Sequence, residues 1–230
     1  MPYILPESKV AVFFSPKSAG TSVRAFLFEL ENGFPLRSYS VQGVRHDVTT
    51  LANRLLVNSK FRLVNHAELA DFERIALVRD PVRRVLSAYS NRVLYYRELS
   101  EEVAGPALQA NGLAPDPDFD LFMANIAGYI KCSASIGRHL SLQERFLGKS
   151  KDYFARVFRV EDMASFEAHM NERFGTTCSV PRLQEGGPKL DFRSFSAETR
   201  RRVIDFVRSS VIFDWFPQYK EDYAEFLTTA

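Results

Sequence analysis

The sequence predicts an α/β protein whose central, mainly parallel sheet is flanked by helices. One observation is the uninterrupted apolar run Val10–Phe14, which is typical of a parallel strand buried on both faces. A second run, over 74–78, has the same character, and a short turn joins each run to a helical pattern. Strand and helix patterns then alternate along the chain, as they do in proteins built from parallel strands and crossover helices.

Hydrophobic periodicity divides the 230 residues into alternating elements. Strands are predicted near 10–14, 36–42, 61–65, 74–78 and 156–160, and helices near 20–31, 48–57, 81–98, 118–130, 162–174 and 196–209. The stretches 105–117 and 181–188, rich in proline and glycine, are predicted loops; the second is either a lid over a ligand or a plain surface connection. The length fits one domain over 1–230, and the aromatic run 213–216 is expected to pack in the core.

The turn after the first strand is polar and contains one lysine, in the order Ser15-Pro-Lys-Ser-Ala-Gly-Thr-Ser22. A helix is predicted to begin within it, because apolar residues at 23, 26, 27 and 30 share one helical face. The N–H groups at a helix start have no intrahelical partner, and together with the helix dipole they favour a phosphate or sulfate. The residues predicted to bind this anion are Lys17, Ser18, Ala19, Gly20, Thr21 and Ser22.

The P-loop of ATP and GTP enzymes is a rival interpretation of this turn. That loop needs the pattern G-x-x-x-x-G-K-[ST], in which the lysine follows the glycines at the helix start. The chain has no such string, because Lys17 precedes Gly20. Lys17 is therefore expected to approach the anion from the strand side of the turn.

A second strand-to-helix junction lies over 74–91. Asp80 is placed to cap its helix, and Pro81 occupies the first helical position. Arg79 is left at the carboxyl end of the strand, and Ser87 follows on the polar side of the helix. Because an arginine offers a planar fork that fits phosphate oxygens and a hydroxyl can complete the shell, this pair predicts a second anion contact.

Both junctions resemble the donor-binding motifs of sulfotransferases that use 3′-phosphoadenosine-5′-phosphosulfate (PAPS). The run Pro16–Ser22 is similar to their 5′-phosphosulfate loop, and Arg79 followed eight residues later by Ser87 is similar to their 3′-phosphate grip. The likeness is closest to the branch that includes carbohydrate sulfotransferases and many small bacterial enzymes, with the pattern V-R-D-P-x-x-R-x-x-S-x-Y. The residues that fill this pattern are Val78, Arg79, Asp80, Pro81, Arg84, Ser87 and Tyr89.

Weaker likeness to this branch continues along the chain. It covers 139–143, 146–148, 153–154 and 159–163. Two departures stand out: the branch more often has Lys-Thr where Lys17-Ser18 stands, and usually has proline where Leu142 precedes Gln143. Neither departure removes a charged group, although the second bears on any role of Gln143.

The resemblance implies the P-loop-NTPase-like sulfotransferase fold and transfer of a sulfonyl group from PAPS. The acceptor would offer a hydroxyl or an amine, with a carbohydrate or small molecule favoured, and 3′-phosphoadenosine-5′-phosphate (PAP) would be released. A lysine at the position of Lys17 implies neutralisation of the charge that grows on the leaving phosphate, with donor binding alone as the alternative. The resemblance implies no metal.

An acceptor hydroxyl also needs a general base, and histidine is suited to this because it titrates near neutrality. His46 is the first candidate, because a histidine follows the second strand in several related carbohydrate enzymes. His66 competes with it, as do Asp and Glu residues in loops. A structural, hydrogen-bonded histidine is the alternative for His46 and the favoured interpretation of His66, whereas His139 and His169 are expected on helix surfaces or in packing.

Composition limits the remaining functions. Thirty basic and 28 acidic residues give a net charge of +2, which argues against a general nucleic-acid binder. Cys132 and Cys178 are too few for a metal site or a disulfide framework, which favours a reducing compartment. No apolar run approaches the roughly 20 residues of a membrane span, and the N-terminus lacks a signal-peptide pattern. A cytoplasmic protein is therefore expected.

Two other function classes stay open. One is a phosphotransferase or other nucleotide-binding enzyme on the same architecture, because a fold does not settle a function. It would prefer ATP and require magnesium. The other is a non-catalytic PAP-binding module or scaffold, which would keep Arg79 and Ser87 without needing Lys17 or a base.

Overall fold

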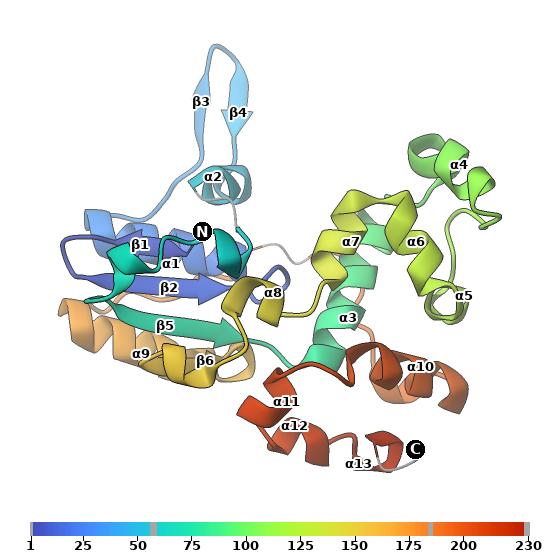
Figure 1. Ribbon diagram of the computed structural model, residues 1–230. Helices are drawn as coiled ribbons and strands as arrows, with labels where there is room; N and C mark the ends of the chain where they lie inside the picture. Colours follow the sequence, from blue (N-terminus) through green and yellow to red (C-terminus); the bar gives the residue numbers. More distant parts are fainter. Residues whose placement is uncertain (1, 56–58, 184–185, 228–230) are drawn as a thin grey trace. The chain divides into compact units, whose positions relative to one another are not determined.

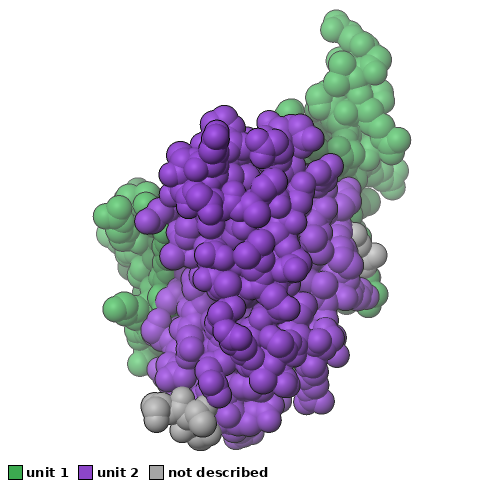
Figure 2. Space-filling model, turned by 90° about the vertical axis from the view of Figure 1, so that its right-hand side faces the viewer, with its two compact units in different colours: residues 1–79, 143–185 green, residues 80–142, 186–230 purple. Residues whose placement is uncertain are grey.

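The computed structural model describes residues 2–55, 59–183 and 186–227 (Figure 1). The chain falls into two compact units, which Figure 2 shows in different colours. The first unit takes residues 1–79 and 143–185, and the second takes residues 80–142 and 186–230. The chain therefore leaves the first unit after Arg79 and returns to it at Gln143.

The first unit is built on a four-stranded sheet in the order β1-β2-β5-β6. Its strands are β1 (Tyr3–Leu5), β2 (Val10–Phe14), β5 (Glu73–Val78) and β6 (Arg156–Arg159). Strands β2, β5 and β6 are parallel, whereas β1 pairs antiparallel with β2. The α/β class is confirmed, but the sheet is mixed, and β1 was missed because three residues are too few to show a period.

Helices α1 (Gly20–Asn32) and α9 (Met163–Phe174) pack on one face of this sheet. Alternate residues of β2 point into the core that they share, including Val10, Val12 and Phe14. Because successive side chains of a strand point to opposite faces, the remaining residues of β2 contact the other face. All five residues of β2 are buried, as the uninterrupted apolar run predicts.

The opposite face is covered by short elements. They are η1 (Phe61–Leu63), α8 (Glu144–Leu147) and η4 (Lys151–Tyr153). The ring centroids of Phe13 and Phe61 are 6.2 Å apart, and those of Phe13 and Tyr153 are 5.8 Å apart. The strand predicted over 61–65 is therefore wrong, because residues 61–63 form the helix η1 and the Phe61 ring packs against the sheet.

A separate hairpin belongs to the same unit and stands away from the sheet (Figure 1). It consists of β3 (Tyr39–Val41) and β4 (Val44–His46), and α2 (Val48–Leu55) follows. The predicted strand near 36–42 exists in part, but it pairs only with β4. Its residues are exposed, so it contributes nothing to the core.

The second unit is helical, and Tyr89 is one centre of its packing. The Tyr89 ring contacts those of Phe119 and Phe122 at centroid distances of 5.0 and 5.1 Å. Phe213 and Trp215 are buried, which confirms the predicted packing role of the aromatic run. The helices of this unit are α3 (Pro81–Tyr89), the π-helix η3 (Ser90–Tyr95), α4 (Glu101–Ala110), α5 (Phe119–Ala124), α6 (Ile126–Cys132), α7 (Ala134–Leu140), η6 (Phe192–Ser194), α10 (Ala197–Val207), α11 (Ile212–Trp215), α12 (Gln218–Glu221) and α13 (Ala224–Leu227).

The predicted loop over 105–117 is wrong in its first half. Helix α4 runs through it to Ala110 with Pro106 inside the helix. Ala104 and Leu108, one turn apart on α4, are both buried, so apolar periodicity outweighs the proline. The stretch 181–188 has no helix or strand among its described residues; 184–185 lie outside them, and the lid stays a prediction.

Candidate functional site

The turn between β2 and α1 has an unusual backbone. Lys17 and Ala19 have φ angles of 66° and 55°, in the left-handed region that residues other than glycine seldom adopt. Such a conformation costs roughly 1–3 kcal/mol and persists only where the surrounding structure enforces it. One enforcing contact is the N–H of Ser18, which donates to the carbonyl of Ser15 at 3.2 Å. The turn leaves Lys17 partly exposed just beyond the carboxyl end of β2.

Helix α1 begins without a capping side chain. Its N-cap residue is Ala19, which has no side-chain oxygen that could accept from the first turn. By helix geometry, the N–H groups of Gly20, Thr21 and Ser22 have no intrahelical acceptor. Together with the helix dipole, these donors make the start of α1 suitable for an anion, as predicted.

Gly20 allows the strand and the helix to approach closely. A Cβ atom at this position would lie 2.9 Å from Cε2 of Phe14, which is closer than real Cβ contacts. The Phe14 ring is itself held in place, because the guanidinium of Arg24 lies 5.0 Å from its centroid. The glycine is therefore required by packing against the last residue of β2.

The hydroxyl groups of α1 have protein partners. Thr21 Oγ1 donates to Asn53 Oδ1 at 3.0 Å, so its hydrogen is directed at α2. Ser22 Oγ accepts from the N–H of Leu183 at 3.0 Å, a bond that uses an oxygen lone pair and leaves the hydroxyl hydrogen for another acceptor. Ser22 is therefore better placed than Thr21 to donate a side-chain hydrogen bond to an anion.

Arg79 is tied to the same turn. Its Nη1 donates to the carbonyl of Lys17 at 2.9 Å, so the two predicted phosphate-binding cations belong to one contact network. Its backbone N–H donates to Oε1 of Gln143 at 3.1 Å, and its carbonyl accepts from Nε2 of Gln143 at 2.6 Å. The structure thus brings together Lys17, Arg79 and the start of α1, as the two motifs predict.

This network matches what a comparison with known families finds. A model described as the sulfotransferase family matches residues 3–226, nearly the whole chain. The chain belongs to the sulfotransferase family. It matches no curated protein and no solved structure. Membership makes the protein an enzyme that transfers a sulfonyl group, and it agrees with the resemblance carried by the two junction motifs.

Ser87, the predicted partner of Arg79 in this sulfotransferase, lies on α3 in the second unit. Arg79 closes the first unit, so the pairing of the two stays a prediction. Arg84, which also matches the motif, has a structural role, because its guanidinium donates to the carbonyls of His139 and Ser141 at the end of α7. The side chain of Arg84 is 2% exposed and so is not presented to solvent.

His46, the first candidate for the base, ends the exposed hairpin of the sulfotransferase. Its ring stacks on Tyr39 with centroids 4.8 Å apart and an interplanar angle of 27°. The next residue, Asp47, caps α2 by accepting from the N–H of Thr50 at 2.9 Å, and this bond lowers the pKa of its carboxyl. The catalytic role of His46 stays a prediction.

His66 is held by two partners. Its Nδ1 lies 2.8 Å from the hydroxyl of Tyr153, and its Nε2 lies 3.0 Å from the carbonyl of Phe61. Both ring nitrogens of His66 therefore have hydrogen-bonding partners, and its ring packs against those of Phe61 and Tyr153. Burial raises the pKa of the Tyr153 phenol, which stays a neutral hydrogen-bonding group. The structural interpretation of His66 is confirmed.

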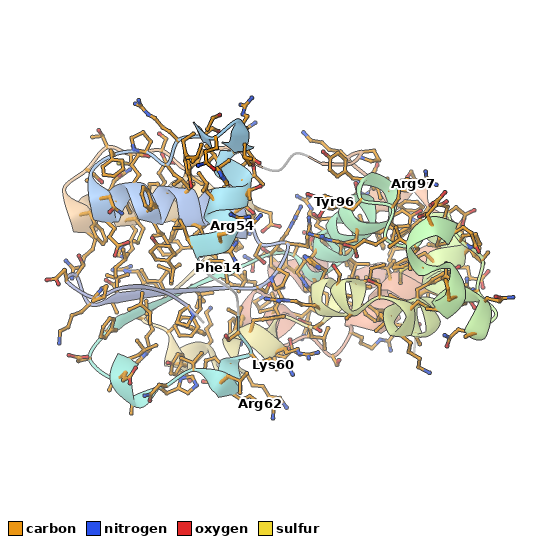
Figure 3. The ribbon with its side chains drawn as sticks, turned by 90° about the horizontal axis from the view of Figure 1, so that it is seen from above. Phe14, Arg54, Lys60, Arg62, Tyr96 and Arg97 are labelled. Carbon is orange, nitrogen blue, oxygen red and sulfur yellow. The ribbon has the colours of Figure 1, made fainter. Side chains whose placement is uncertain are left out.

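A pocket of about 390 Å³ lies beside α8 in the first unit. Figure 3 labels two of its basic residues, Lys60 and Arg62, on the other side of β2 from Arg54. Glu144, in its lining, directly follows Gln143, so the pocket adjoins the contact network through α8. Its lining residues include three bases and one acid, and they are Lys60, Phe61, Arg62, Glu144 and Arg145.

The described residues contain no metal-ligand cluster and no membrane-spanning helix. Within residues 2–55, 59–183 and 186–227, no three His, Cys, Asp or Glu side chains gather as metal ligands. The helices in the same ranges include none that is both long and apolar enough to cross a membrane. A further residue of the contact network is Gln143, for which the only signal in the sequence is its place in the weak likeness over 139–143.

Proposed function

We propose that this sulfotransferase takes its sulfonyl group from PAPS and releases PAP. The observation that carries the proposal is the uncapped start of α1, next to Lys17 and joined to Arg79 by the hydrogen bond between Arg79 Nη1 and the Lys17 carbonyl. Two cations and a row of N–H groups suit a donor that carries several phosphate and sulfate charges. The acceptor is proposed to be a carbohydrate or small molecule with a hydroxyl or an amine.

Each group at this site has a proposed task. The N–H groups of residues 19–22 would hold the 5′-phosphosulfate, whereas the Ser18 N–H is already bonded to Ser15. Arg79 and Ser87 would hold the 3′-phosphate. As the acceptor oxygen bonds to sulfur and the sulfur–oxygen bond to the phosphate breaks, Lys17 would neutralise the negative charge that grows on the leaving phosphate oxygen. None of these tasks requires a metal.

Both units are proposed to form one sulfotransferase domain over 1–230. The family match supports this, because it runs from residue 3 to residue 226 and so includes residues of both units.

His46 is proposed to take the proton from the acceptor. Its replacement by alanine should lower kcat about 100-fold, with donor affinity unchanged. The rate of PAP release from PAPS, with any alcohol or amine that the wild type turns over, measures this. His169→Ala is the control, because His169 lies on α9 and has no proposed catalytic role. Its Nε2 is 2.9 Å from Oε1 of Glu73. An unaltered kcat in His46→Ala would assign the base elsewhere.

Calorimetry with PAP and ADP in the absence of magnesium tests the donor. PAP carries a 3′-phosphate that ADP lacks, so the wild type should bind PAP much more tightly. Arg79→Ala should weaken PAP binding about 10- to 100-fold, since a hydrogen bond to a charged group contributes about 1.5–3 kcal/mol, and should leave ADP affinity nearly unchanged. Equal affinity for both nucleotides, or none for either, would overturn the proposal.

The result also separates the two alternatives. A preference for ATP that appears only with magnesium would indicate a phosphotransferase. Tight PAP binding without PAP release from PAPS, over a panel of alcohols, sugars and amines, would indicate a non-catalytic module. The sulfotransferase proposal expects PAP binding without magnesium and turnover that depends on Lys17.

A further inference from the structure

Gln143 is a buried polar side chain with partners on both junctions. It is 1% exposed, yet it lies at the point where the chain returns to the first unit. Its Oε1 accepts from Ser15 Oγ at 3.3 Å, from Ser18 Oγ at 3.4 Å and from the N–H of Arg79 at 3.1 Å. Its Nε2 donates to the carbonyl of Arg79 at 2.6 Å. One amide thus holds the turn after β2 and the residue after β5.

This amide acts as a hydrogen-bonding partner for the backbone of Arg79, beyond the last residue pair of β2 and β5. The register of β2 and β5 ends at Phe14 with Leu77, and Arg79 lies two residues further on. There the Gln143 side chain binds both the N–H and the carbonyl of Arg79, as a neighbouring strand would. The amide therefore fixes the peptide of Arg79 at the place where backbone pairing has stopped.

The turn after β2 depends on such external support. Lys17 and Ala19 hold left-handed backbone conformations on either side of Ser18. Ser18 is fully buried, and its Oγ contacts Ser15 Oγ at 2.9 Å as well as Gln143. Because Gln143 anchors Ser18, it restrains the residue between the two strained positions. The Arg79 guanidinium closes the network through the Lys17 carbonyl.

We infer that Gln143 is a positioning residue, which sets Lys17 and Arg79 in their donor-binding geometry without touching the donor. The inference rests on the proposed PAPS-dependent function. A glutamine suits the position because its side chain both accepts and donates, and the Arg79 peptide presents one donor and one acceptor. A side chain that offers only one of these functions can keep one of the two hydrogen bonds to the Arg79 backbone and loses the other.

Replacement by glutamate separates this role from mere packing. Gln143→Glu keeps the size and the accepting oxygen, but an ionised carboxylate cannot donate to the Arg79 carbonyl, and it places a negative charge beside an anion site. Once protonated, the carboxyl has an O–H that can donate to that carbonyl. Burial favours this neutral form, whereas the neighbouring cations Lys17 and Arg79 favour the ionised form, so protonation needs a lower pH. The variant should therefore regain donor affinity as the pH falls.

Asn171 offers a matched control in the same unit. Its Nδ2 donates to the Cys178 carbonyl at 2.7 Å, and its Oδ1 accepts from Thr176 Oγ1 at 2.7 Å, so it is also an amide that anchors a loop. It lies near the end of α9, where Arg173 donates to the carbonyl of Ser8 before β2 begins. That contact places Asn171 toward the amino end of β2, the opposite end from Lys17.

The experiment is PAP affinity by calorimetry between pH 5.5 and 8 for the wild type, Gln143→Glu, Gln143→Leu and Asn171→Ala. At pH 8, both Gln143 variants should bind PAP at least about tenfold more weakly than the wild type, and Asn171→Ala should match the wild type. Relative to the wild type at each pH, Gln143→Glu should recover most of its affinity near pH 5.5, whereas Gln143→Leu should not. Thermal unfolding at each pH identifies any variant that fails to fold. If Gln143→Leu fails to fold, Gln143→Glu alone tests the inference.

Each outcome has a distinct meaning. Recovery specific to Gln143→Glu supports the positioning role. Wild-type affinity in both Gln143 variants at pH 8, or equal weakening in Asn171→Ala, overturns it, because the network would then serve folding alone. Absence of PAP binding by the wild type overturns the proposed function itself.

Discussion

The two strand-to-helix junctions have the same order of elements and opposite chemistry. After β2, the N-cap of α1 is Ala19, which offers no side-chain oxygen. After β5, the N-cap of α3 is Asp80, whose Oδ1 accepts from the N–H of Val82 at 2.8 Å. The start of α1 has N–H groups for which helix geometry provides no acceptor, whereas the start of α3 is capped by a carboxylate of the chain.

This difference shows which part of each junction can bind a ligand. At the first junction the proposed anion contacts are backbone N–H groups, and the loop holds left-handed conformations at Lys17 and Ala19. At the second junction the helix start is capped by Asp80, and the proposed binding group is the side chain before it, Arg79. Asp80 is 1% exposed and also accepts from the hydroxyl of Tyr223 at 2.6 Å. Burial beside Asp80 raises the pKa of that phenol above its ordinary value.

The largest expected effect comes from removing the lysine of the first junction. Lys17→Ala should lower kcat about 100- to 1000-fold, because one group that stabilises developing charge often contributes this much. The rate of PAP release from PAPS measures it. Lys9→Ala is a matched control: Lys9 has a φ of 50°, precedes β2 and pairs with Asp71. Comparable losses in the two variants would contradict a catalytic Lys17.

A second prediction converts the first junction into a copy of the second. Ala19→Asp should place a carboxylate at the N-cap of α1 and weaken PAP binding about 100-fold, because it neutralises the helix start and repels the anion. Ala19→Asn is the isosteric neutral control, and asparagine tolerates the left-handed conformation. Calorimetry should show near wild-type affinity for Asn and a large loss for Asp. Similar affinities for the two variants would mean that no anion binds there.

The smallest expected effect lies at the second junction. Asp80→Ala should lower the free energy of unfolding by about 1–2 kcal/mol, because α3 loses its cap. Urea unfolding measures the loss. Asp80→Asn should lose less, since its amide oxygen can still accept from Val82. An unchanged midpoint in Asp80→Ala would show that this cap does not stabilise the fold, and the contrast between the junctions would fail.

The elements near the site were predictable to different degrees. Strand β2 and helix α1 follow from local patterns, and the Asp80 cap with Pro81 was readable before the structure. The apolar residues of 61–65 predict a strand, because a short apolar run in a 3-10 helix cannot be told from a strand by period alone. The proline and glycine of 105–117 predict a loop, although Ala104 and Leu108 have the spacing of a buried helix face in α4.

The sequence by itself determined the two junctions, since strand pattern, turn chemistry and helix capping act between residues close together in the chain. It also named the charged groups that the junctions present, Lys17 and Arg79. Only the tertiary structure decided how they are held. Gln143 binds Arg79 across 64 residues and Ser15 across 128 residues, and a hydrogen bond formed at such a separation leaves no period in the sequence. The backbone strain at Lys17 is tolerated because these distant contacts enforce it.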